Sequence, residues 1–305
     1  SFFVLTEASP NRSLCVRARM CTCEGVLILK PEGRLLAAAG HASECGKRPD
    51  NQDFVGLYTA TETERSRHGM IAALADGVGG AKGGRLAAEL AVRELIEGLY
   101  AQPDTIGPAA AAARVMGPFN RWLHSMGKSD TMAHAATTFT ALIIKGRKAH
   151  VVHVGDSRAW HFRDGRLTCL TEDHTRPHPD QRHILYRALG IEERLRLDHQ
   201  AVPLDVHDRL LLTSDGVHGM LSARQIEKLL GMRGSAEADA VALVEAALAA
   251  GSQDNASAAI IDIVALPALD HDAVAGDVAR LPIQPPPNEC DSIDGFQLEM
   301  LLSDG

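Results

Sequence analysis

Apolar residues in this chain gather into short runs that end abruptly at turn residues. The clearest run begins after His68 and ends at Asp76, with glycine following at Gly77 and again at positions 79 and 80. A short apolar run bounded by turn residues predicts a buried strand, which places Asp76 where that strand reaches the surface. The same pattern predicts further strands over residues 35–40, 53–58, 138–144, 150–154, 209–214 and 256–266.

Helical spacing of apolar residues marks two longer stretches, 85–99 and 109–124. The second stretch contains Pro118, which predicts a kink or a break because proline lacks a backbone donor. Two shorter helices are predicted to begin at Ser222 and at Ser235, because serine is a favoured N-cap residue.

Several strands follow one another through tight turns. Residues 159–163 lead through Asp164 and Gly165 into residues 167–170, which predicts a hairpin. Strands therefore arrive in hairpin-like runs and do not alternate strictly with helices. This pattern predicts an α+β fold with antiparallel sheets.

Composition places the chain among ordinary globular proteins and argues against several classes of partner. Its 305 residues, 45% of them apolar and 23% charged, are enough for a sizeable core. A net charge of −8 argues against nucleic acid as the main partner, because phosphate backbones require clustered lysine and arginine. No apolar run approaches the roughly 20 residues of a membrane span, and the first residues lack a signal-peptide pattern. The six cysteines form no Cys-x-x-Cys pair, which favours a reducing, cytoplasmic setting.

The composition changes after Leu266. Residues 282–287 are rich in proline, which predicts a stiff and extended linker, and apolar residues then alternate from Phe296 to Leu302. We predict four parts: an N-terminal extension over 1–33, one domain over 34–266, a Pro-rich linker over 267–293, and the start of a further domain, or a tail, over 294–305.

Five aspartates lie at predicted strand ends beside small or turn residues: Asp53, Asp76, Asp156, Asp215 and Asp254. If those ends converge, several like charges share one pocket, and bound cations make that arrangement tolerable. Carboxylate-rich sites built from oxygen ligands suit Mg²⁺ or Mn²⁺. Two such ions about 4 Å apart can lower the pKa of a bridging water and clamp a phosphoryl group, so that no covalent nucleophile is needed.

Eight short segments carry a resemblance to a known family. They are residues 48–53, 75–80, 137–141, 154–158, 170–174, 187–190, 214–217 and 254–256. In this order and spacing they resemble the protein phosphatase 2C family, the metal-dependent serine/threonine phosphatases, and in particular its compact bacterial members. The resemblance covers residues from about 34 to 266 and implies a four-layer αββα sandwich, with two central antiparallel β-sheets flanked by helices.

The resemblance implies a role for each matching residue at a site that holds two Mn²⁺ or Mg²⁺ ions. Asp76 would bridge the two ions, and the carbonyl of Gly77 would reach one of them. Asp215 and Asp254 would complete the site of the other ion. Asp53 would support the cluster, either directly or through a water.

Two further roles and two departures follow from the same resemblance. Asp156 resembles the residue that helps to hold a third, weaker metal in bacterial members, and Arg48 resembles the arginine that grips the substrate phosphate. Gln52 stands where many relatives have glutamate. Val78 stands where animal members carry a histidine proposed as general acid, which leaves the proton donor to the leaving group unassigned.

The last residues carry a second resemblance. Residues 294–305 are similar to the first strand of a protein kinase entering its glycine-rich loop, and some bacterial proteins join such a phosphatase to a kinase through a Pro-rich linker. This similarity implies a serine/threonine kinase encoded in the same chain as a partner. An ordinary terminal strand or tail explains the same residues equally well.

We therefore predict that the chain hydrolyses phosphoserine and phosphothreonine in phosphorylated proteins through a metal-activated water, with Arg48 and Asp76 as catalytic residues. An alternative is a catalytically weak, phosphatase-like regulatory domain that binds a phosphoprotein or a fused kinase. A third hypothesis is a metal-independent esterase that uses Ser157. A cysteine phosphatase is excluded because Cys169 and Arg176 are separated by one residue too many for a Cys-x₅-Arg motif.

Overall fold

Two β-sheets form the centre of the fold, and most of their strands pair antiparallel. The first sheet runs in the order β1-β3-β4-β6-β7-β10, with β5 paired to β4 and with β1 parallel to β3. Its strands are β1 (Phe3–Val4), β3 (Asp53–Tyr58), β4 (Met70–Val78), β5 (Ala136–Thr137), β6 (Phe139–Lys145), β7 (Lys148–Val154) and β10 (Asp198–Pro203).

The second sheet runs in the order β2-β12-β11-β8-β9 and is antiparallel throughout. Its strands are β2 (Leu36–Glu44), β8 (Arg158–Arg163), β9 (Arg166–Cys169), β11 (Arg209–Thr213) and β12 (Ala256–Ala265). The helices are α2 (Ala81–Tyr100), α3 (Pro108–Met126), α4 (Asp215–His218), α5 (Ala223–Gly231) and α6 (Ala236–Ala249).

The computed structural model describes residues 3–4, 34–59, 61, 65, 67–78, 81–127, 135–176, 184–268, 292–293 and 296–297. The chain divides into two compact units, Ser1–Pro267 and Ala268–Gly305. In the second unit, the strands β13 (Ser292–Ile293) and β14 (Phe296–Gln297) pair with each other. The rest of the predicted alternation up to residue 302 lies outside the described residues. None of the helices in the described ranges is both long and apolar enough to cross a membrane.

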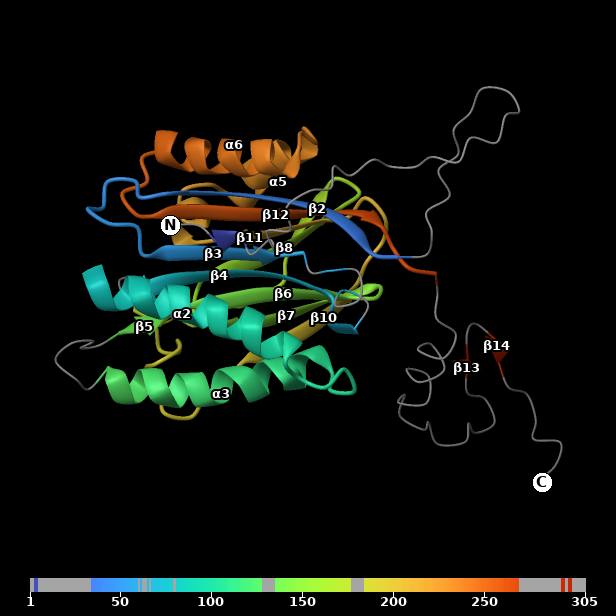
Figure 1. Cartoon of the computed structure of the whole chain (residues 1–305). Coiled ribbons are helices and arrows are strands. Elements are labelled where there is room, and N and C mark those ends of the chain that lie inside the picture. The colour runs from blue at the N-terminus through green and yellow to red at the C-terminus, as the bar shows by residue number, and fades with distance from the viewer. Residues whose placement is uncertain are drawn as a thin grey trace, which may run out of the picture. The chain divides into compact units, whose positions relative to one another are not determined.

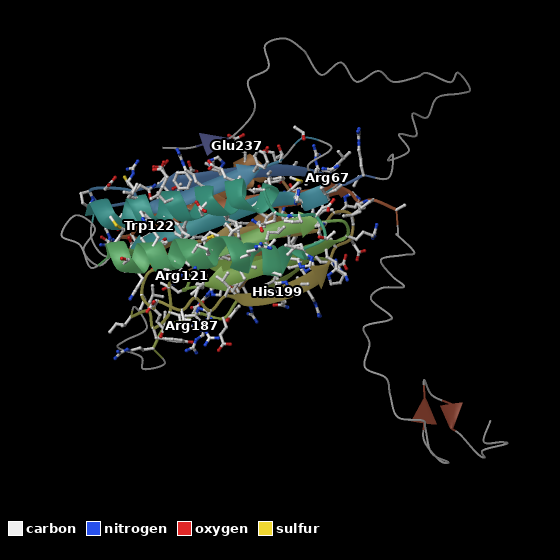
Figure 2. The ribbon with its side chains drawn as sticks, turned by 60° about the horizontal axis from the view of Figure 1, so that its bottom comes forward. Arg67, Arg121, Trp122, Arg187, His199 and Glu237 are labelled. Carbon is white, nitrogen blue, oxygen red and sulfur yellow. The ribbon has the colours of Figure 1, made fainter. Side chains whose placement is uncertain are left out.

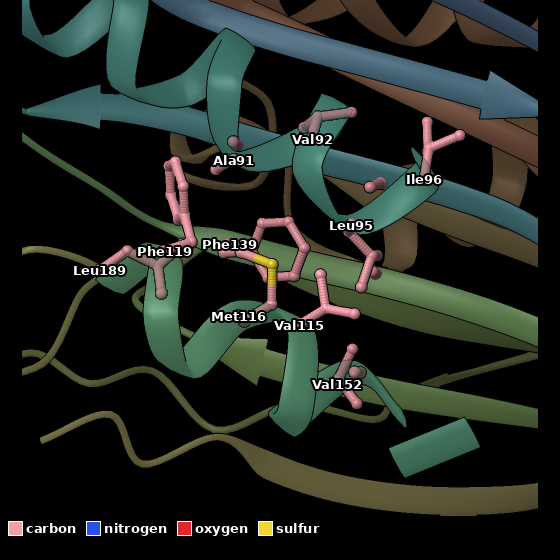
Figure 3. Close-up of a cluster of buried hydrophobic side chains, with 14 of the residues drawn as sticks. Ala91, Val92, Leu95, Ile96, Val115, Met116, Phe119, Phe139, Val152 and Leu189 are labelled. Carbon is pink, nitrogen blue, oxygen red and sulfur yellow. The ribbon is translucent and has the colours of Figure 1, made fainter. Parts of the chain in front are cut away.

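Three apolar clusters separate four layers of secondary structure. One cluster lies between the first sheet and the helices α2 and α3, and Figure 3 shows Phe139 of β6 packed among Leu95 of α2 and Met116 of α3. A second cluster fills the space between the two sheets, and a third lies between the second sheet and the helices α5 and α6. The arrangement, with helices outside both sheets, is the predicted αββα sandwich (Figure 1).

Strand β4 is buried on both faces, which explains its unbroken apolar sequence. Ile71 and Ala73 belong to the cluster on the helix side, whereas Ala72 and Leu74 belong to the cluster between the sheets. Because successive side chains of a strand point to opposite faces, Asp76 continues the row that faces the second sheet. Asp76, near the end of the strand, is therefore aimed into the interior of the sandwich, at one end.

Two features differ from the sequence-based prediction. Helix α3 continues through Pro118, so the prediction of a break there is wrong. The proline lies on the exposed side of the helix. The carbonyl of Arg114, which loses its helical hydrogen bond to the proline, can therefore be hydrated. Strand β10 was not predicted, because its sequence is mostly polar and five of its six residues are exposed. The segment forms a strand because it pairs antiparallel with β7, which the local sequence does not reveal.

Candidate metal centre

Asp53 and Asp76 occupy directly opposed positions on two neighbouring strands. Asp53 begins β3, Asp76 lies near the end of β4, and their Cα atoms are partners in the antiparallel register. Val55 and Leu57 of β3 belong to the cluster between the sheets, so alternation points Asp53 to the same interior face as Asp76. Side chains that are directly opposed in this way lie about 5 Å apart at Cβ.

Three more aspartates come to the same end of the sandwich from connections between other elements. Asp215 is the first residue of α4, directly after β11; Asp254 lies just before β12; and Asp156 lies in the turn between β7 and β8. The charges of Asp53, Asp215, Asp156 and Asp254 all raise the pKa of Asp76. The structure therefore brings together the five aspartates that were singled out in the sequence.

Burial, followed by mutual repulsion, raises the pKa values of four of these carboxyl groups. The pKa of Asp53 rises to about 7, chiefly through burial and then through the charges of Asp215 and Asp254. The pKa of Asp156 also rises to about 7, again chiefly through burial. Burial likewise raises the pKa of Asp76 well above its ordinary value and that of Asp215 above its own.

Three oxygens of this cluster lack protein partners among the described residues. Both carboxylate oxygens of Asp53 and Oδ1 of Asp215 are buried and accept no hydrogen bond from the described residues. The hydroxyls of Ser214 and Ser257 are close enough to oppose part of the pKa rise of Asp53. However, Ser257 Oγ donates to Ser43 Oγ at 2.7 Å, and Ser214 Oγ points to the carbonyl of Asn255 at 3.5 Å. Buried acceptor oxygens without donors are the arrangement expected of cation ligands.

The donor set fits hard divalent cations. Among the described residues no three carboxylate, histidine or cysteine side chains are grouped closely enough to hold one ion by themselves. Mg²⁺ is ordinarily bound by only one or two carboxylates and keeps several waters, so a site of this kind does not require three side chains on one ion. The Asp53 and Asp76 carboxylates, with the carbonyl of Gly77 at the same strand end, provide oxygen ligands of the right type.

Arg48 lies beside the carboxylate cluster. Its Nη2 donates to Oδ2 of Asp254 at 2.7 Å, and the hydrogen bond and charge of Asp254 raise the pKa of Arg48. The charges of Asp215 and Asp76 raise the pKa of Arg48 as well, so the guanidinium lies near these two carboxylates also. Its side chain is 58% exposed, so an incoming anion can reach it from solvent.

Thr138 was part of a matching segment but received no role from the sequence. Its Oγ1 accepts a hydrogen bond from the backbone N–H of Asp76 at 3.0 Å, and its own N–H donates to the Asp76 carbonyl at 2.8 Å. Thr137 Oγ1 donates to the same carbonyl at 2.9 Å. These bonds fix the backbone on both sides of the Asp76 side chain. The consecutive threonines were a usable signal, because hydroxyls beside a strand end often bond to the neighbouring backbone.

Asn255 fastens the loop that carries Arg48 and Asp53. It is 5% exposed, its Oδ1 accepts from the Gln52 N–H at 2.9 Å, and its Nδ2 donates to the carbonyls of Cys45 and Asp50, both at 3.0 Å. A buried amide with all these bonds made is a rigid connection between β12 and the loop before β3. The sequence offered no sign of this role beyond the position of the asparagine next to Asp254.

Two glycines allow α2 to start directly against the end of β4. A Cβ atom at Gly77 would lie 2.3 Å from the backbone of Gly84, and one at Gly84 would lie 2.9 Å from the backbone of Gly77. Any side chain at either position would push the helix away from the strand end. Gly77 and Gly84 thus serve close backbone approach, which is one of the reasons glycine is used in such turns.

His174 is a structural residue that supports the turn containing Asp156. It is 2% exposed, its Nδ1 accepts from the N–H of Gly155 at 3.0 Å, and its Nε2 lies 2.9 Å from Oδ2 of Asp198. Arg187 also bonds to Asp198, so His174 connects β10 to the residue that precedes Asp156. This agrees with its interpretation from the sequence as a loop residue and not a proton donor.

Ser157 is not placed as a nucleophile. It is 1% exposed, and its Oγ lies 2.5 Å from Oγ1 of Thr138. In the described part of the chain no histidine hydrogen bonds to it, whereas an activated serine needs an adjacent base. The esterase hypothesis therefore loses its structural basis.

Comparison with known proteins identifies the family of this chain. The profile of the family described as Protein phosphatase 2C matches residues 46–262. Protein phosphatase PhpP of Streptococcus pneumoniae is 30% identical over 235 residues, which cover 71% of this chain and 93% of that protein. The serine/threonine phosphatase stp of Listeria monocytogenes is 26% identical over 235 residues, which cover 70% of this chain and 91% of that protein.

Solved structures agree with this assignment. The serine/threonine phosphatase Stp1 from Staphylococcus aureus superposes with a TM-score of 0.68 at 25% identity, covering 80% of this chain and 100% of that one. The Mycobacterium tuberculosis serine/threonine phosphatase PstP/Ppp superposes with a TM-score of 0.63 at 28% identity, covering 75% of this chain and 99% of that one. With its two-sheet sandwich and its family profile matched over residues 46–262, this chain belongs to the protein phosphatase 2C family of serine/threonine phosphatases.

Proposed function

We propose that this protein hydrolyses phosphoserine and phosphothreonine in phosphorylated proteins by direct attack of a metal-activated water. The observation that carries the proposal is the set of like charges at one end of the sandwich, in which Asp53 and Asp215 have buried oxygens without partners. Uncompensated carboxylates in a buried cluster are stabilised by divalent cations. The family's dependence on divalent metal points in the same direction.

The residues would divide the work in the following way. Asp76 and the carbonyl of Gly77 would hold one ion, and Asp76 would be shared with a second ion at Asp215 and Asp254, with Asp53 supporting Asp76 across the strand pair. When bound, Mn²⁺ or Mg²⁺ supplies a water of lowered pKa and neutralises charge on the phosphoryl oxygens.

A third, weaker metal position would involve Asp156. Its pKa is raised by burial and then by the charges of Asp215 and Asp173, so it shares the negative potential of the main cluster. Asp173 is itself held by two hydrogen bonds from Arg158, at 2.8 and 2.7 Å, which leaves Asp156 as the uncompensated carboxylate of this turn.

Arg48 would bind the substrate phosphate. Its planar guanidinium can donate two hydrogen bonds to phosphoryl oxygens, and its exposed position lets the ion pair with Asp254 exchange for a substrate anion. The bond to Asp254 would keep the guanidinium oriented toward the cluster in the free enzyme.

The deciding experiment is hydrolysis of a phosphothreonine peptide by the full chain with Mn²⁺, with Mg²⁺, and then with excess EDTA. We expect turnover with metal and none after chelation. Turnover that survives chelation would rule out the metal mechanism. Binding of the phosphopeptide without turnover in any metal would support the alternative, a phosphatase-like regulatory domain.

We also propose that residues 34–266 are sufficient for catalysis and that 1–33 and 267–305 are appendages. The profile match over 46–262 supports these limits. A chain restricted to 34–266 should then hydrolyse the peptide at the rate of the full chain. A serine/threonine kinase as partner, and a reducing, cytoplasmic setting, stay predictions; the free thiols of Cys45 and Cys169 are compatible with the latter.

A further inference from the structure

An open groove runs between α3 and the segment that leads into β10, on a face that the catalytic proposal does not use. Its volume is about 570 Å³, and its lining includes Ala113, Gly117, Arg121, Arg194, Leu195 and Arg196. We call it the arginine groove. Figure 2 shows Arg121 on α3, with Arg187 on the segment below it. The volume is within the range of natural ligand sites.

The arginine groove is positively charged in a chain that is negative overall. Three arginines line it, Arg121, Arg194 and Arg196, against one carboxylate, Glu193. The net charge of the chain is −8. All three arginine residues are exposed, and no ion pair to a described carboxylate neutralises them. A local excess of unpaired guanidinium groups attracts anions, and guanidinium is the side chain best suited to phosphate.

The floor of the groove is apolar and open. Ala113, Gly117 and Arg121 follow one another at one helical turn each, so this side of the groove is about 12 Å long, enough for three or four residues of extended peptide. A Cβ atom at Gly117 would meet nothing closer than Nη1 of Arg121 at 3.9 Å. The guanidinium of Arg121 is therefore the nearest neighbour of this position, and the space directly over Gly117 is otherwise open.

The opposite wall is held rigidly. Nδ2 of Asn120, on α3, donates to the carbonyls of Glu192 and Glu193 at 2.8 and 3.0 Å, and its Oδ1 accepts from the N–H of Gly190 at 2.9 Å. Nη2 of Arg187 donates to the carbonyl of Arg196 at 2.7 Å. The backbone that carries Arg194 and Arg196 is thus ordered, so little backbone conformational entropy is lost when an anion binds.

One wall of the groove lies near the metal centre. A small cavity of about 10 Å³ shares Arg194, Leu195 and Arg196 with the groove and is also lined by Val154 and Arg187. Val154 is two residues from Asp156, a separation of at most about 7 Å along the chain. The wall of the arginine groove and Asp156 are therefore close in the fold, within the length of a short extended peptide.

We propose that the arginine groove binds a second phosphorylated segment of the phosphoprotein substrate and so makes the enzyme selective for multiply phosphorylated proteins. The inference rests on the proposed phosphatase function, because that function brings phosphorylated chains to the protein. Charge complementarity identifies the occupant: the guanidinium groups would take phosphate oxygens, and Leu195 with Ala113 would contact the apolar parts of the peptide.

The kinetic test compares two peptides on the full chain with Mn²⁺. One carries a single phosphothreonine, and the other adds a phosphoserine about three, six or nine residues to either side. At the best spacing we expect kcat/KM about tenfold higher for the doubly phosphorylated peptide, the contribution of one charge-assisted contact. Arg121→Glu and Arg194→Glu should reduce the ratio to about one, whereas Arg224→Glu, on α5 of the opposite helix layer, should leave it unchanged.

A binding test separates this proposal from the catalytic one. With EDTA present, fluorescence anisotropy of the labelled doubly phosphorylated peptide should show a Kd about tenfold higher for Arg121→Glu than for the wild type or for Arg224→Glu. If no peptide is hydrolysed with any metal, the proposed function fails. The anisotropy measurement still shows whether the arginine groove binds the phosphopeptide.

Three results would overturn the proposal. The first is an equal kcat/KM for singly and doubly phosphorylated peptides at every spacing. The second is an equal peptide affinity of the wild type and both charge-reversal variants. The third is tighter binding of a single-stranded oligonucleotide than of a phosphopeptide with the same charge. Melting temperatures should be alike for all variants, since the substituted side chains are exposed.

Discussion

Asp53 and Asp76 are direct partners across the antiparallel strands β3 and β4, so two carboxylates face each other at one end of the sandwich. Directly opposed like charges destabilise a strand pair, and burial increases the cost. The surrounding structure nevertheless holds both backbones firmly, through Thr138 at Asp76 and Asn255 at the loop before Asp53. The arrangement costs stability and keeps two carboxylates fixed in place.

Asp76→Asn should separate stability from activity. Turnover of the phosphothreonine peptide should fall by at least about 100-fold, because even residues that only support a metal ligand cost 10- to 100-fold. In EDTA the variant should melt at or above the wild-type temperature, since it removes one of the repelling charges. Isothermal titration with Mn²⁺ should show weakened binding. A near-wild-type rate would contradict the assignment of Asp76.

The stability of the metal-free protein should depend on pH through these carboxyl groups. Asp53 and Asp156 have pKa values of about 7 in the folded chain against an ordinary 3.8, so between these values the folded state binds more protons than the unfolded state. Stability contributed by these groups is present at low pH and is lost as the pH rises toward 7.

Buried histidines act in the opposite direction over part of this range. Burial lowers the pKa of His153 to about 4 and that of His218 to about 3, so their contribution is lost as the pH falls below about 6.5. The difference in melting temperature between Asp53→Asn and the wild type, both in EDTA, isolates the carboxylate part. That difference should grow in favour of the variant from about pH 5 to about pH 8. A difference independent of pH would contradict the raised pKa of Asp53.

Arg48→Ala should act mainly on substrate binding. We expect KM for the phosphopeptide to rise about tenfold with a smaller change in kcat, because the guanidinium contacts the phosphate in the ground state as well as in the transition state. Arg224→Ala, an exposed arginine on α5, is the matched control and should leave KM unchanged. An unchanged KM for Arg48→Ala would argue against its role in binding.

Asn255→Ala should weaken both the fold and the metal site. Loss of its three hydrogen bonds leaves buried backbone groups unpaired, at a cost of about 1–3 kcal/mol for each uncompensated group. Asn120→Ala is the matched control, because Asn120 is also buried and makes three bonds, but to residues 190–193. Both variants should melt at a lower temperature, and unfold at a lower urea concentration, than the wild type. Only Asn255→Ala should also weaken Mn²⁺ binding. Equal Mn²⁺ affinity in the two variants would refute the role of Asn255.

Local sequence was sufficient to predict most elements of the sandwich and the positions of its aspartates. The buried strands are apolar on both faces, so runs such as the one ending at Asp76 stand out without any alignment. The helices α5 and α6 begin at the serines predicted to cap them. Strand β10 could not be found in this way, because an exposed edge strand carries little apolar signal and depends on pairing with β7.

The sequence by itself pointed to the residues proposed to carry the chemistry, which are acidic residues at strand ends and an arginine near the first of them. Only the tertiary structure decided that Asp53 and Asp76 are opposed in one ladder, that Thr138 and Asn255 fix them, and that Ser157 is enclosed. It also created the arginine groove, whose residues come from two segments more than seventy positions apart. The physical reason is that a sequence motif records the chemistry of one strand end. Charge repulsion, hydrogen-bond satisfaction and grooves arise between segments that come together only when the chain folds.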